Sequence, residues 1–283
     1  MRIIADCGAT KSEWRILHLD GTADRFMTGG MNASTMSADA IAAIIAETGK
    51  KISATDSSAA EIYLYMAGIP SDELSGRVKD LFNVHIPVSK IEINTDLTGA
   101  ARAVCGHGPG IAAILGTGSN SCQYDGEKIV KRVYSSGFIL GDEGSAATLG
   151  KLFIADFLKG LVPEAISSEF SSRYPSDYGT IISNIYRSED SPSGYLGGFA
   201  PFILEHYDHP YIQKLVDGNF RAFIRRSLKQ YDTDTYEVGV VGGFGHALQD
   251  IFGRIASEEG IRISCFMKDP VEGLVEYHRL SHP

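Results

Sequence analysis

Residues 3–12 read IIADCGATKS, and residues 112–121 read AAILGTGSNS. Each stretch begins with apolar residues typical of a buried strand, continues into a turn rich in glycine, threonine and serine, and then starts a second strand. The two stretches begin about 110 residues apart in the chain. This repeat predicts two domains of similar topology that face each other, with the two turns meeting at a cleft.

The length of the chain also favours two domains, because 283 residues exceed what a single hydrophobic core usually serves. We expect a first domain over residues 1–108 and a second domain over residues 109–269, which carries a helical insertion. A last helix, at about residues 270–283, is expected to pack back on the first domain.

The composition excludes several classes of partner. A net charge of −9 argues against binding to nucleic acid or to an anionic membrane. Neither a signal peptide nor a membrane span is expected, because only a short apolar run precedes Asp6 and no apolar stretch approaches about 20 residues. The four cysteines have no CxxC spacing, so we expect reduced thiols and a cytoplasmic protein.

The first turn, DCGATK at residues 6–11, has the composition of a phosphate-binding loop. Gly8 permits close approach of the backbone, Thr10 supplies a hydroxyl and Lys11 supplies a positive charge. A glycine turn of this kind can direct amides at a phosphate, while the carboxylate of Asp6 holds Mg²⁺ directly or through water. The alternative is an ordinary hairpin turn.

The second turn, GTGSN at residues 116–120, is not a dinucleotide fingerprint. Ser121 stands where GxGxxG has its third glycine, and no helix is expected to follow. The side chains of Thr117, Ser119 and Asn120 can still donate hydrogen bonds to phosphate oxygens or to sugar hydroxyls.

A third glycine turn lies in VVGGFGHAL at residues 240–248, and it also fails the dinucleotide pattern because Leu248 replaces the third glycine. Paired glycines at a strand end, here Gly242 and Gly243, can let an adenine lie against the backbone. Tight packing of a strand on a helix explains them equally well.

The stretch GDEGSAATLGK at residues 141–151 superficially resembles a P-loop. Its two later glycines are separated by five residues instead of four, and Leu152 replaces the hydroxyl that would bind Mg²⁺. We therefore predict a helix start capped by Ser145, with Asp142 and Glu143 near its N-terminus. That structural role accounts less well for Asp142, and Lys151 is expected to be an ordinary helix residue.

Two further polar residues follow predicted strands. Asp96, in INTDLTGAA, is expected at a strand end, where it either caps the next helix or faces the cleft as a base that accepts a proton from an alcohol. Asn32, in GGMNAS, lies in a loop and either hydrogen-bonds a ligand or makes a local turn.

The order of these motifs is more specific than any one of them. DxGxTK, a Thr-Asp at a strand end, GTGSN, GDEGSA about twenty residues later and a late glycine pair together resemble the BadF/BadG/BcrA/BcrD-type ATPase family. Within it, the chain is most similar to the N-acetylglucosamine kinase-like branch, and the similarity covers essentially the whole chain. The resemblance implies an α/β, actin-like ATPase fold with two ribonuclease-H-like domains around a central cleft.

The resemblance also implies roles for individual residues. The ATP-binding positions it implies are Asp6, Gly8, Thr10, Lys11, Thr117, Gly242 and Gly243, with Asp6 placing Mg²⁺ through water. The sugar-binding positions it implies are Asn32, Asp96, Gly118, Ser119, Asn120, Gly137 and Asp142, with Asp96 as the catalytic base.

The sequence departs from the family in informative ways. Cys7 stands where a small residue is usual, and SSGF at residues 135–138 replaces the Gly-Gly-Trp-Gly of close sugar kinases, which affects the choice of sugar. The zinc-binding CxCGxxGC motif of ROK sugar kinases is absent, as is the cysteine signature of iron–sulfur dehydratase activases.

The resemblance implies an enzyme of carbohydrate metabolism, a kinase that transfers the γ-phosphate of ATP to a hydroxyl, the 6-OH above all, of an amino sugar such as N-acetylglucosamine. A homodimer is compatible with it. Two alternatives stay open: an ATPase that activates a partner enzyme, and a sugar or nucleotide sensor without catalysis.

Overall fold

The computed structural model describes residues 1–8, 11–18, 20–32, 36–53, 60–67, 72–85, 87–187 and 191–280. The chain divides into two compact units. The first comprises Met1–His107 together with the residues from Pro270 onward, and the second comprises Gly108–Asp269. We describe each unit by itself.

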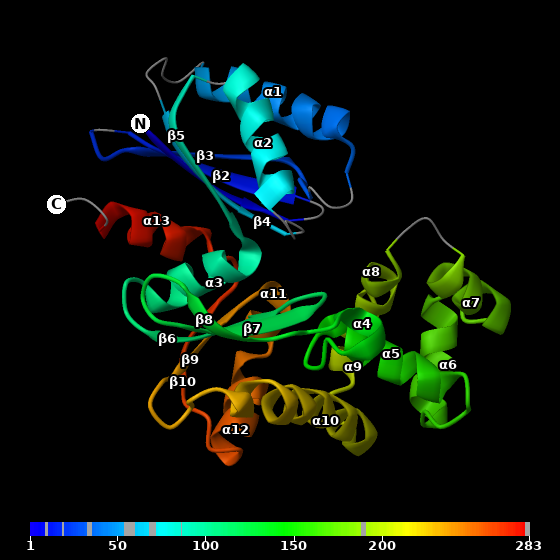
Figure 1. The fold of residues 1–283 in the computed structure, drawn as a ribbon. Coiled ribbons are helices and arrows are strands. Elements are labelled where there is room, and N and C mark those ends of the chain that lie inside the picture. The colour runs from blue at the N-terminus through cyan, green and yellow to red at the C-terminus, as the bar shows by residue number, and fades with distance from the viewer. Residues whose placement is uncertain are drawn as a thin grey trace. The chain divides into compact units, whose positions relative to one another are not determined.

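The first unit is built on a five-stranded mixed sheet with the order β3-β2-β1-β4-β5 (Figure 1). β1 is antiparallel to β2 and parallel to β4, β2 is antiparallel to β3, and β4 is parallel to β5. Its strands are β1 Arg2–Cys7, β2 Lys11–Leu17, β3 Ala23–Gly29, β4 Ala60–Met66 and β5 Val88–Thr95.

Helices cover both faces of this sheet. Figure 1 shows α1 (Ala38–Ser53) and α2 (Asp72–His85) on one face and α3 (Asp96–Cys105) with α13 (Val271–Leu280) on the other. Trp14, fully buried in β2, anchors the core beneath α1 and α2, with its ring 6.2 Å from that of Phe82. Central strands covered on both faces read as continuous apolar runs, which explains RIIADC in β1.

The second unit repeats the topology of the first. Its sheet has the order β10-β9-β6-β7-β8, with β6 antiparallel to β7 and parallel to β9. Its strands are β6 Gly110–Leu115, β7 Ser119–Tyr124, β8 Ile129–Val133, β9 Val238–Val241 and β10 Ile263–Met267. β6 and β7 thus correspond to β1 and β2, so the predicted repeat and the ribonuclease-H-like fold are confirmed.

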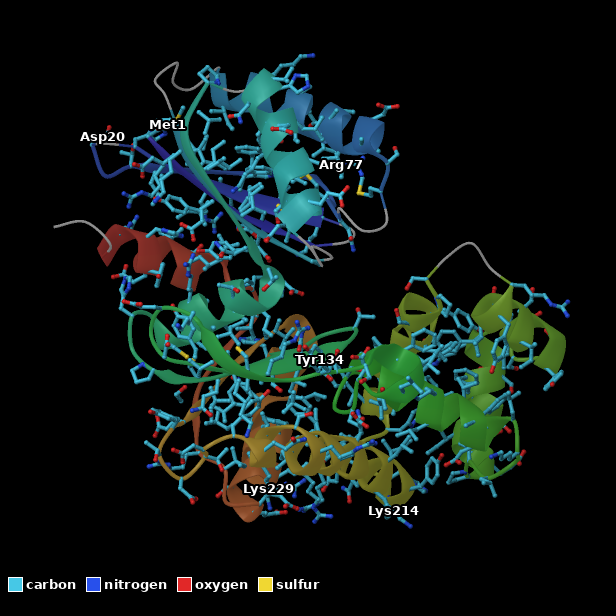
Figure 2. All side chains as sticks on the ribbon, in the orientation of Figure 1. Met1, Asp20, Arg77, Tyr134, Lys214 and Lys229 are labelled. Carbon is cyan, nitrogen blue, oxygen red and sulfur yellow. The ribbon has the colours of Figure 1, made fainter. Side chains whose placement is uncertain are left out.

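A helical segment is inserted between β8 and β9. It contains α4 Gly137–Leu140, α5 Ala146–Phe157, α6 Glu164–Arg173, α7 Tyr178–Tyr186, α8 Pro192–Gly197, α9 Ala200–Glu205, α10 Pro210–Arg226 and the 3₁₀ turn Leu228–Gln230. After β9 follow α11 Gly243–Ala247 and α12 Gln249–Glu258. Phenylalanines and isoleucines make up much of the core of the second unit, and α10 buries Phe220 and Phe223 while Lys214 points outward (Figure 2).

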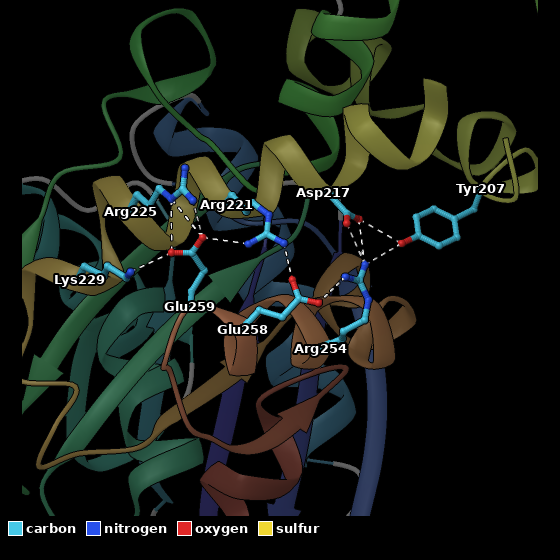
Figure 3. Close-up of polar contacts among 8 residues, drawn as sticks. All are labelled: Tyr207, Asp217, Arg221, Arg225, Lys229, Arg254, Glu258 and Glu259. Atoms are coloured by element: carbon cyan, nitrogen blue, oxygen red, sulfur yellow. Dashed lines mark hydrogen bonds and ion pairs between the residues drawn. The ribbon is translucent and has the colours of Figure 1, made fainter. Parts of the chain in front are cut away.

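Charged side chains join α10 to α12 on the surface of the second unit (Figure 3). Glu259 accepts from Arg221 at 2.9 Å, from Arg225 at 2.7 Å and from Lys229 at 2.8 Å. The hydrogen bonds from Arg225 and Lys229 lower the pKa of Glu259 to about 2. This carboxylate is therefore ionised at neutral pH and holds the two helices together.

The edge strand β3 has no counterpart in the predicted repeat, which consists of a strand, a turn and a second strand. β3 is largely exposed, and its sequence ADRFMTG lacks a clear apolar alternation. Among the described helices, none is long and apolar enough to cross a membrane.

The C-terminal helix α13 packs against α3, β1 and β2. Its His278 is 3% exposed, and the ring nitrogen Nε2 lies 2.8 Å from the Tyr65 hydroxyl, which also accepts from Arg102 at 2.9 Å. Burial lowers the pKa of His278 to about 3, and the charge of Arg102 acts in the same direction, whereas Glu92 opposes it. The imidazole is therefore neutral in the folded protein.

The first unit should lose stability as the pH falls from about 6.5 towards 3. In this range His278 is protonated in the unfolded chain but stays neutral in the folded protein, so protonation favours unfolding. Uptake of this one proton contributes at most about 1.4 kcal/mol per pH unit to the pH dependence of the unfolding free energy. His278→Gln should remove that slope. Urea unfolding at several pH values, followed by fluorescence of Trp14, the single tryptophan, measures it. Parallel curves for the two proteins would contradict the assignment.

Candidate active site

The predicted site residues of the first unit gather at one edge of its sheet. β1, β3, β4 and β5 run in the same direction, so their carboxyl ends share an edge. Asp6 lies near the end of β1, Asn32 follows β3, Asp96 follows β5, and Lys11 begins the antiparallel β2 at the same edge. Since neighbouring strands lie about 4.8 Å apart, the two carboxylate-bearing positions are separated by roughly 10 Å across β4.

The turn between β1 and β2 is closed by its own backbone. The amide of Gly8 donates to the carbonyl of Lys11 at 3.0 Å, and the Gly8 carbonyl accepts from the amide of Met31 at 3.0 Å. A Cβ on Gly8 would lie 3.2 Å from the Lys11 oxygen, so a side chain there would crowd the turn. The turn is thus tied to the segment that carries Asn32, while Thr10 falls outside the described residues.

Asp96 is the first residue of α3 but it does not cap the helix. Thr95 is the N-cap, and its hydroxyl accepts from the amide of Thr98 at 3.2 Å. The Asp96 oxygen Oδ1 accepts from the next amide, that of Leu97, at 2.8 Å. The helix start is therefore already satisfied by Thr95, which weakens the purely structural explanation for a carboxylate at position 96.

The second unit has a matching edge, where β6 and β9 end. The amide of Gly116 donates to the carbonyl of Gly118 at 3.0 Å, which makes the GTG turn tight. Gly242 follows β9 with φ of 123°, and a Cβ there would lie 2.4 Å from the carbonyl oxygen of Leu115. Only glycine fits this position, so Gly242 and the exposed Gly243 present bare backbone beside the GTG turn.

The start of α5 is bonded to the same turn. The amides of Ala146 and Ala147 donate to the carbonyls of Gly116 and Thr117 at 3.0 and 3.1 Å. The Ser145 hydroxyl accepts from the amide of Thr148 at 3.1 Å, as predicted for a cap. These first amides of α5 therefore donate to protein carbonyls and not to a phosphate, which agrees with the rejection of a P-loop in GDEGSAATLGK.

Asp142 lies against the GTG turn. Its oxygen Oδ1 accepts from the amide of Ser119 at 3.3 Å, and a Cβ on Gly118 would come within 3.1 Å of Oδ2. The residue is 8% exposed and has φ of 54°, a conformation that is uncommon outside glycine. Burial raises the pKa of the Asp142 carboxyl, and the Ser119 amide opposes that shift. GTGSN and GDEGSA thus form one structural unit, and its buried carboxylate in an uncommon backbone conformation makes Asp142 a candidate functional residue.

The loop before Asp142 is folded back on itself. The amide of Asp142 donates to the carbonyl of Ser135 at 3.0 Å, and Gly137, at φ 70°, begins α4. A Cβ on Gly141 would lie only 1.8 Å from the Ser135 oxygen, so the loop closes because residue 141 is glycine. Asn120, half-buried in β7, accepts from the amide of Ser121 at 3.0 Å.

Glu143 and Lys151 flank this loop. Glu143 forms an ion pair with Arg226 of α10. Lys151 donates through Nζ to the carbonyl of Phe138 at 2.5 Å, and its charge opposes the rise in the pKa of Asp142 that burial causes. Lys151 lies within α5, as predicted for a helix residue, and its side chain also joins α4 to α5 across thirteen positions.

A resident metal cage is not found among the described residues, where no group of three or more histidine, cysteine or acidic side chains could hold an ion. Mg²⁺ that accompanies a nucleotide needs no such cage, since one or two carboxylates and the phosphates bind it while waters complete the octahedron. Asp6, at the edge beside Gly8, fits that limited role.

The fold defines the class of protein. The sheets β3-β2-β1-β4-β5 and β8-β7-β6-β9-β10 have the same topology. Two such sheets in one chain are the architecture of the actin-like ATPases and sugar kinases. A ROK family glucokinase from Streptomyces griseus, solved in complex with glucose and AMPPNP, aligns over 99% of this chain and 98% of its own, with a TM-score of 0.53 and 16% identity. A putative N-acetylglucosamine kinase from Chromobacterium violaceum aligns over 98% of both chains, with a TM-score of 0.78 and 21% identity.

A nearer relative defines the family. A putative N-acetylglucosamine kinase from Porphyromonas gingivalis is 35% identical over 100% of both chains, with a TM-score of 0.93. This chain belongs to the family of that protein. No family model matches the sequence, and no curated protein matches it either.

Proposed function

We propose that the protein is an ATP-dependent kinase that phosphorylates a hydroxyl, the 6-OH above all, of an amino sugar such as N-acetylglucosamine. The observation that carries this proposal is the full-length, 35% identical relationship to a putative N-acetylglucosamine kinase. The glycine turns and carboxylates at the two sheet edges supply the groups that such a reaction needs. The finer assignment to the N-acetylglucosamine kinase-like branch of the BadF/BadG/BcrA/BcrD-type ATPases, suggested by motif order, belongs to the same proposal.

In this proposal the glycine turns hold the nucleotide. Gly8, Thr10 and Lys11 bind the phosphates from the first unit and Thr117 binds them from the second. The backbone at Gly242 and Gly243 lies against the adenosine. Tight turns whose backbone is already held by its own hydrogen bonds suit this task, because they cost little reorganisation when a phosphate binds.

The carboxylates divide the remaining work. Asp6 would hold Mg²⁺ through water, and the bound ion would supply positive charge to the phosphates of ATP. Asp142, together with Gly118 and Ser119, orients the sugar hydroxyls. Asn32, Asn120 and Gly137 complete the sugar contacts.

Asp96 acts as the base of the reaction. The sugar O6 attacks the γ-phosphorus as the bond from that phosphorus to the β,γ-bridging oxygen breaks, which releases ADP. The proton of the hydroxyl passes to Asp96 late in the reaction, since it becomes acidic only as the new bond forms.

Location and assembly follow from the same proposal. A kinase that uses ATP and sugars works in the cytoplasm, where both are available, and we propose that location. Small molecules are its partners, with neither nucleic acid nor membrane among them, in keeping with the net charge of −9. A homodimer is compatible with the proposal, and gel filtration would measure it.

A screen of ADP production tests the function. The protein is incubated with ATP and Mg²⁺ and, in turn, with glucose, N-acetylglucosamine, glucosamine, N-acetylmannosamine and N-acetylmuramic acid. We expect ADP release to depend on sugar and to be fastest with an N-acetylated amino sugar. Equal ADP production with every sugar and without sugar would contradict a sugar kinase.

A further inference from the structure

Asn219 lies in the middle of α10, where asparagine is a poor helix former. It occupies the buried stripe of that helix, between Val216 and Phe223, and is itself 3% exposed. A buried amide in an apolar stripe costs stability unless its polar atoms find partners. The hydrogen-bond partners of Asn219 therefore indicate its role.

Both ends of the Asn219 amide bind the turn that carries Asp142. Oδ1 accepts from the amide of Gly144 at 2.8 Å, and Nδ2 donates to the carbonyl of Ser145 at 3.1 Å. These two bonds span the residues between Asp142 and the first turn of α5. The Asn219 side chain thus binds the backbone on both sides of the peptide bond that joins Gly144 to Ser145, two residues after Asp142.

The turn needs such a support. Asp142 has φ of 54° and Gly144 has φ of 79°, and a Cβ on Gly144 would lie 2.7 Å from the Cβ of Phe223. The turn is therefore pressed against α10 in a conformation that chain propensity does not favour. A hollow of about 410 Å³ between α4, α5 and α10 is lined in part by Gly141 and Glu143, so this part of the turn borders open space.

The second tie between the turn and α10 is weaker. Glu143 pairs with Arg226, but the Arg226 side chain is 66% exposed, and exposed ion pairs contribute little to stability. The buried amide of Asn219 is the stronger of the two, because leaving the Gly144 amide and the Ser145 carbonyl unpaired in the interior carries the full cost of their desolvation.

We infer that Asn219 is a positioning residue for the acceptor side of the reaction: it holds the turn that sets Asp142 against Ser119. The inference rests on the proposed function, in which Asp142 orients the sugar. Asn219 touches neither substrate in this account, and it acts only through the backbone of Gly144 and Ser145. The nucleotide side is less affected, because the amides of Ala146 and Ala147 that hold the GTG turn belong to α5 itself.

The test compares Asn219→Ala and Asn219→Asp with Tyr211→Phe. Tyr211 lies on the same helix and donates to Asp156 of α5 at 2.8 Å, so its variant also removes a bond between α10 and α5, but away from the turn. Asn219→Asp keeps the acceptor for the Gly144 amide, loses the donor to Ser145 and sets a carboxylate oxygen against the Ser145 carbonyl. The two variants thus disturb the turn in different ways, and either one that folds allows hydrogen exchange to be measured at the turn.

Two readouts are taken. Hydrogen exchange without ligands should become faster at Gly144 and Ser145 in the Asn219 variants than in Tyr211→Phe. In kinetics, the KM for the sugar should rise about 10- to 100-fold, because small misplacements of a positioning group are costly. The KM for ATP should change by less than about threefold.

The possible outcomes distinguish a failure of the inference on Asn219 from a failure of the proposed function. Unchanged exchange at the turn would overturn the inference, as would faster exchange with an unchanged KM for the sugar in an active enzyme. An equal rise in both KM values would show that Asn219 supports the whole unit and not the acceptor side. Absence of sugar-dependent turnover in the wild-type protein would instead overturn the proposed function, and the inference with it.

Discussion

Asp96→Asn is expected to lower kcat by about 10²–10⁴-fold, the usual contribution of a general base. The amide cannot accept the proton that leaves the sugar hydroxyl, but it keeps the shape and can still hydrogen-bond the sugar. The KM for the sugar should therefore change by less than about threefold. Steady-state kinetics with varied sugar at saturating ATP measures both quantities.

Thr95→Ala is the matched control for this variant. It removes the cap of α3, one residue before Asp96, and should cost about 1 kcal/mol of stability without removing the carboxylate. Its kcat should stay near that of the wild type. If both variants lost kcat equally, the start of α3 would matter to the enzyme for structural reasons alone, and Asp96 would not be its base.

Asp142→Asn should have the complementary effect and raise the KM for the sugar by about 10- to 100-fold, with a smaller loss of kcat. Asparagine tolerates the left-handed backbone at φ 54°, so the fold of the turn should survive. What is lost is the negative charge that accepts from the Ser119 amide and, in this account, from the sugar hydroxyls. Isothermal titration with the sugar measures the loss without relying on turnover.

Glu143→Gln is the matched control for Asp142→Asn, since it removes the neighbouring carboxylate, whose ion-pair partner Arg226 is largely exposed. It should leave the affinity for the sugar close to the wild-type value. If Asp96→Asn kept near-normal kcat while Asp142→Asn abolished it, the roles of the two aspartates would have to be exchanged.

Local sequence patterns predicted the main features of the fold. The apolar runs ending in DCGATK and GTGSN predicted two strand–turn–strand units, and the structure has them as β1–β2 and β6–β7 at equivalent places in two sheets of one topology. These features are readable because a glycine turn and the strands beside it depend on neighbours in the sequence. The strand β3 was not predicted because it is a largely exposed edge strand whose sequence, ADRFMTG, lacks a clear apolar alternation.

The candidate site was predictable only in pieces. The contact of Asp142 with Ser119 spans 23 positions, and those of Asn219 with Gly144 and Ser145 span 75 and 74. Such contacts depend on how α5 and α10 pack, and no local pattern encodes that. A signal did exist for Asn219, since an amide in the apolar stripe of a helix requires buried partners. The capping of α3 by Thr95 instead of Asp96 was likewise ambiguous, because both residue types cap well.

The proposed reaction transfers the γ-phosphate of ATP to a sugar oxygen. Phosphorus NMR of a reaction with N-acetylglucosamine, ATP and Mg²⁺ distinguishes a sugar phosphate from inorganic phosphate. We expect one phosphomonoester, coupled to the two protons on C6, in equal amount to the ADP formed. Inorganic phosphate in equal amount to ADP, with no sugar phosphate, would overturn the proposed kinase activity and indicate an ATPase.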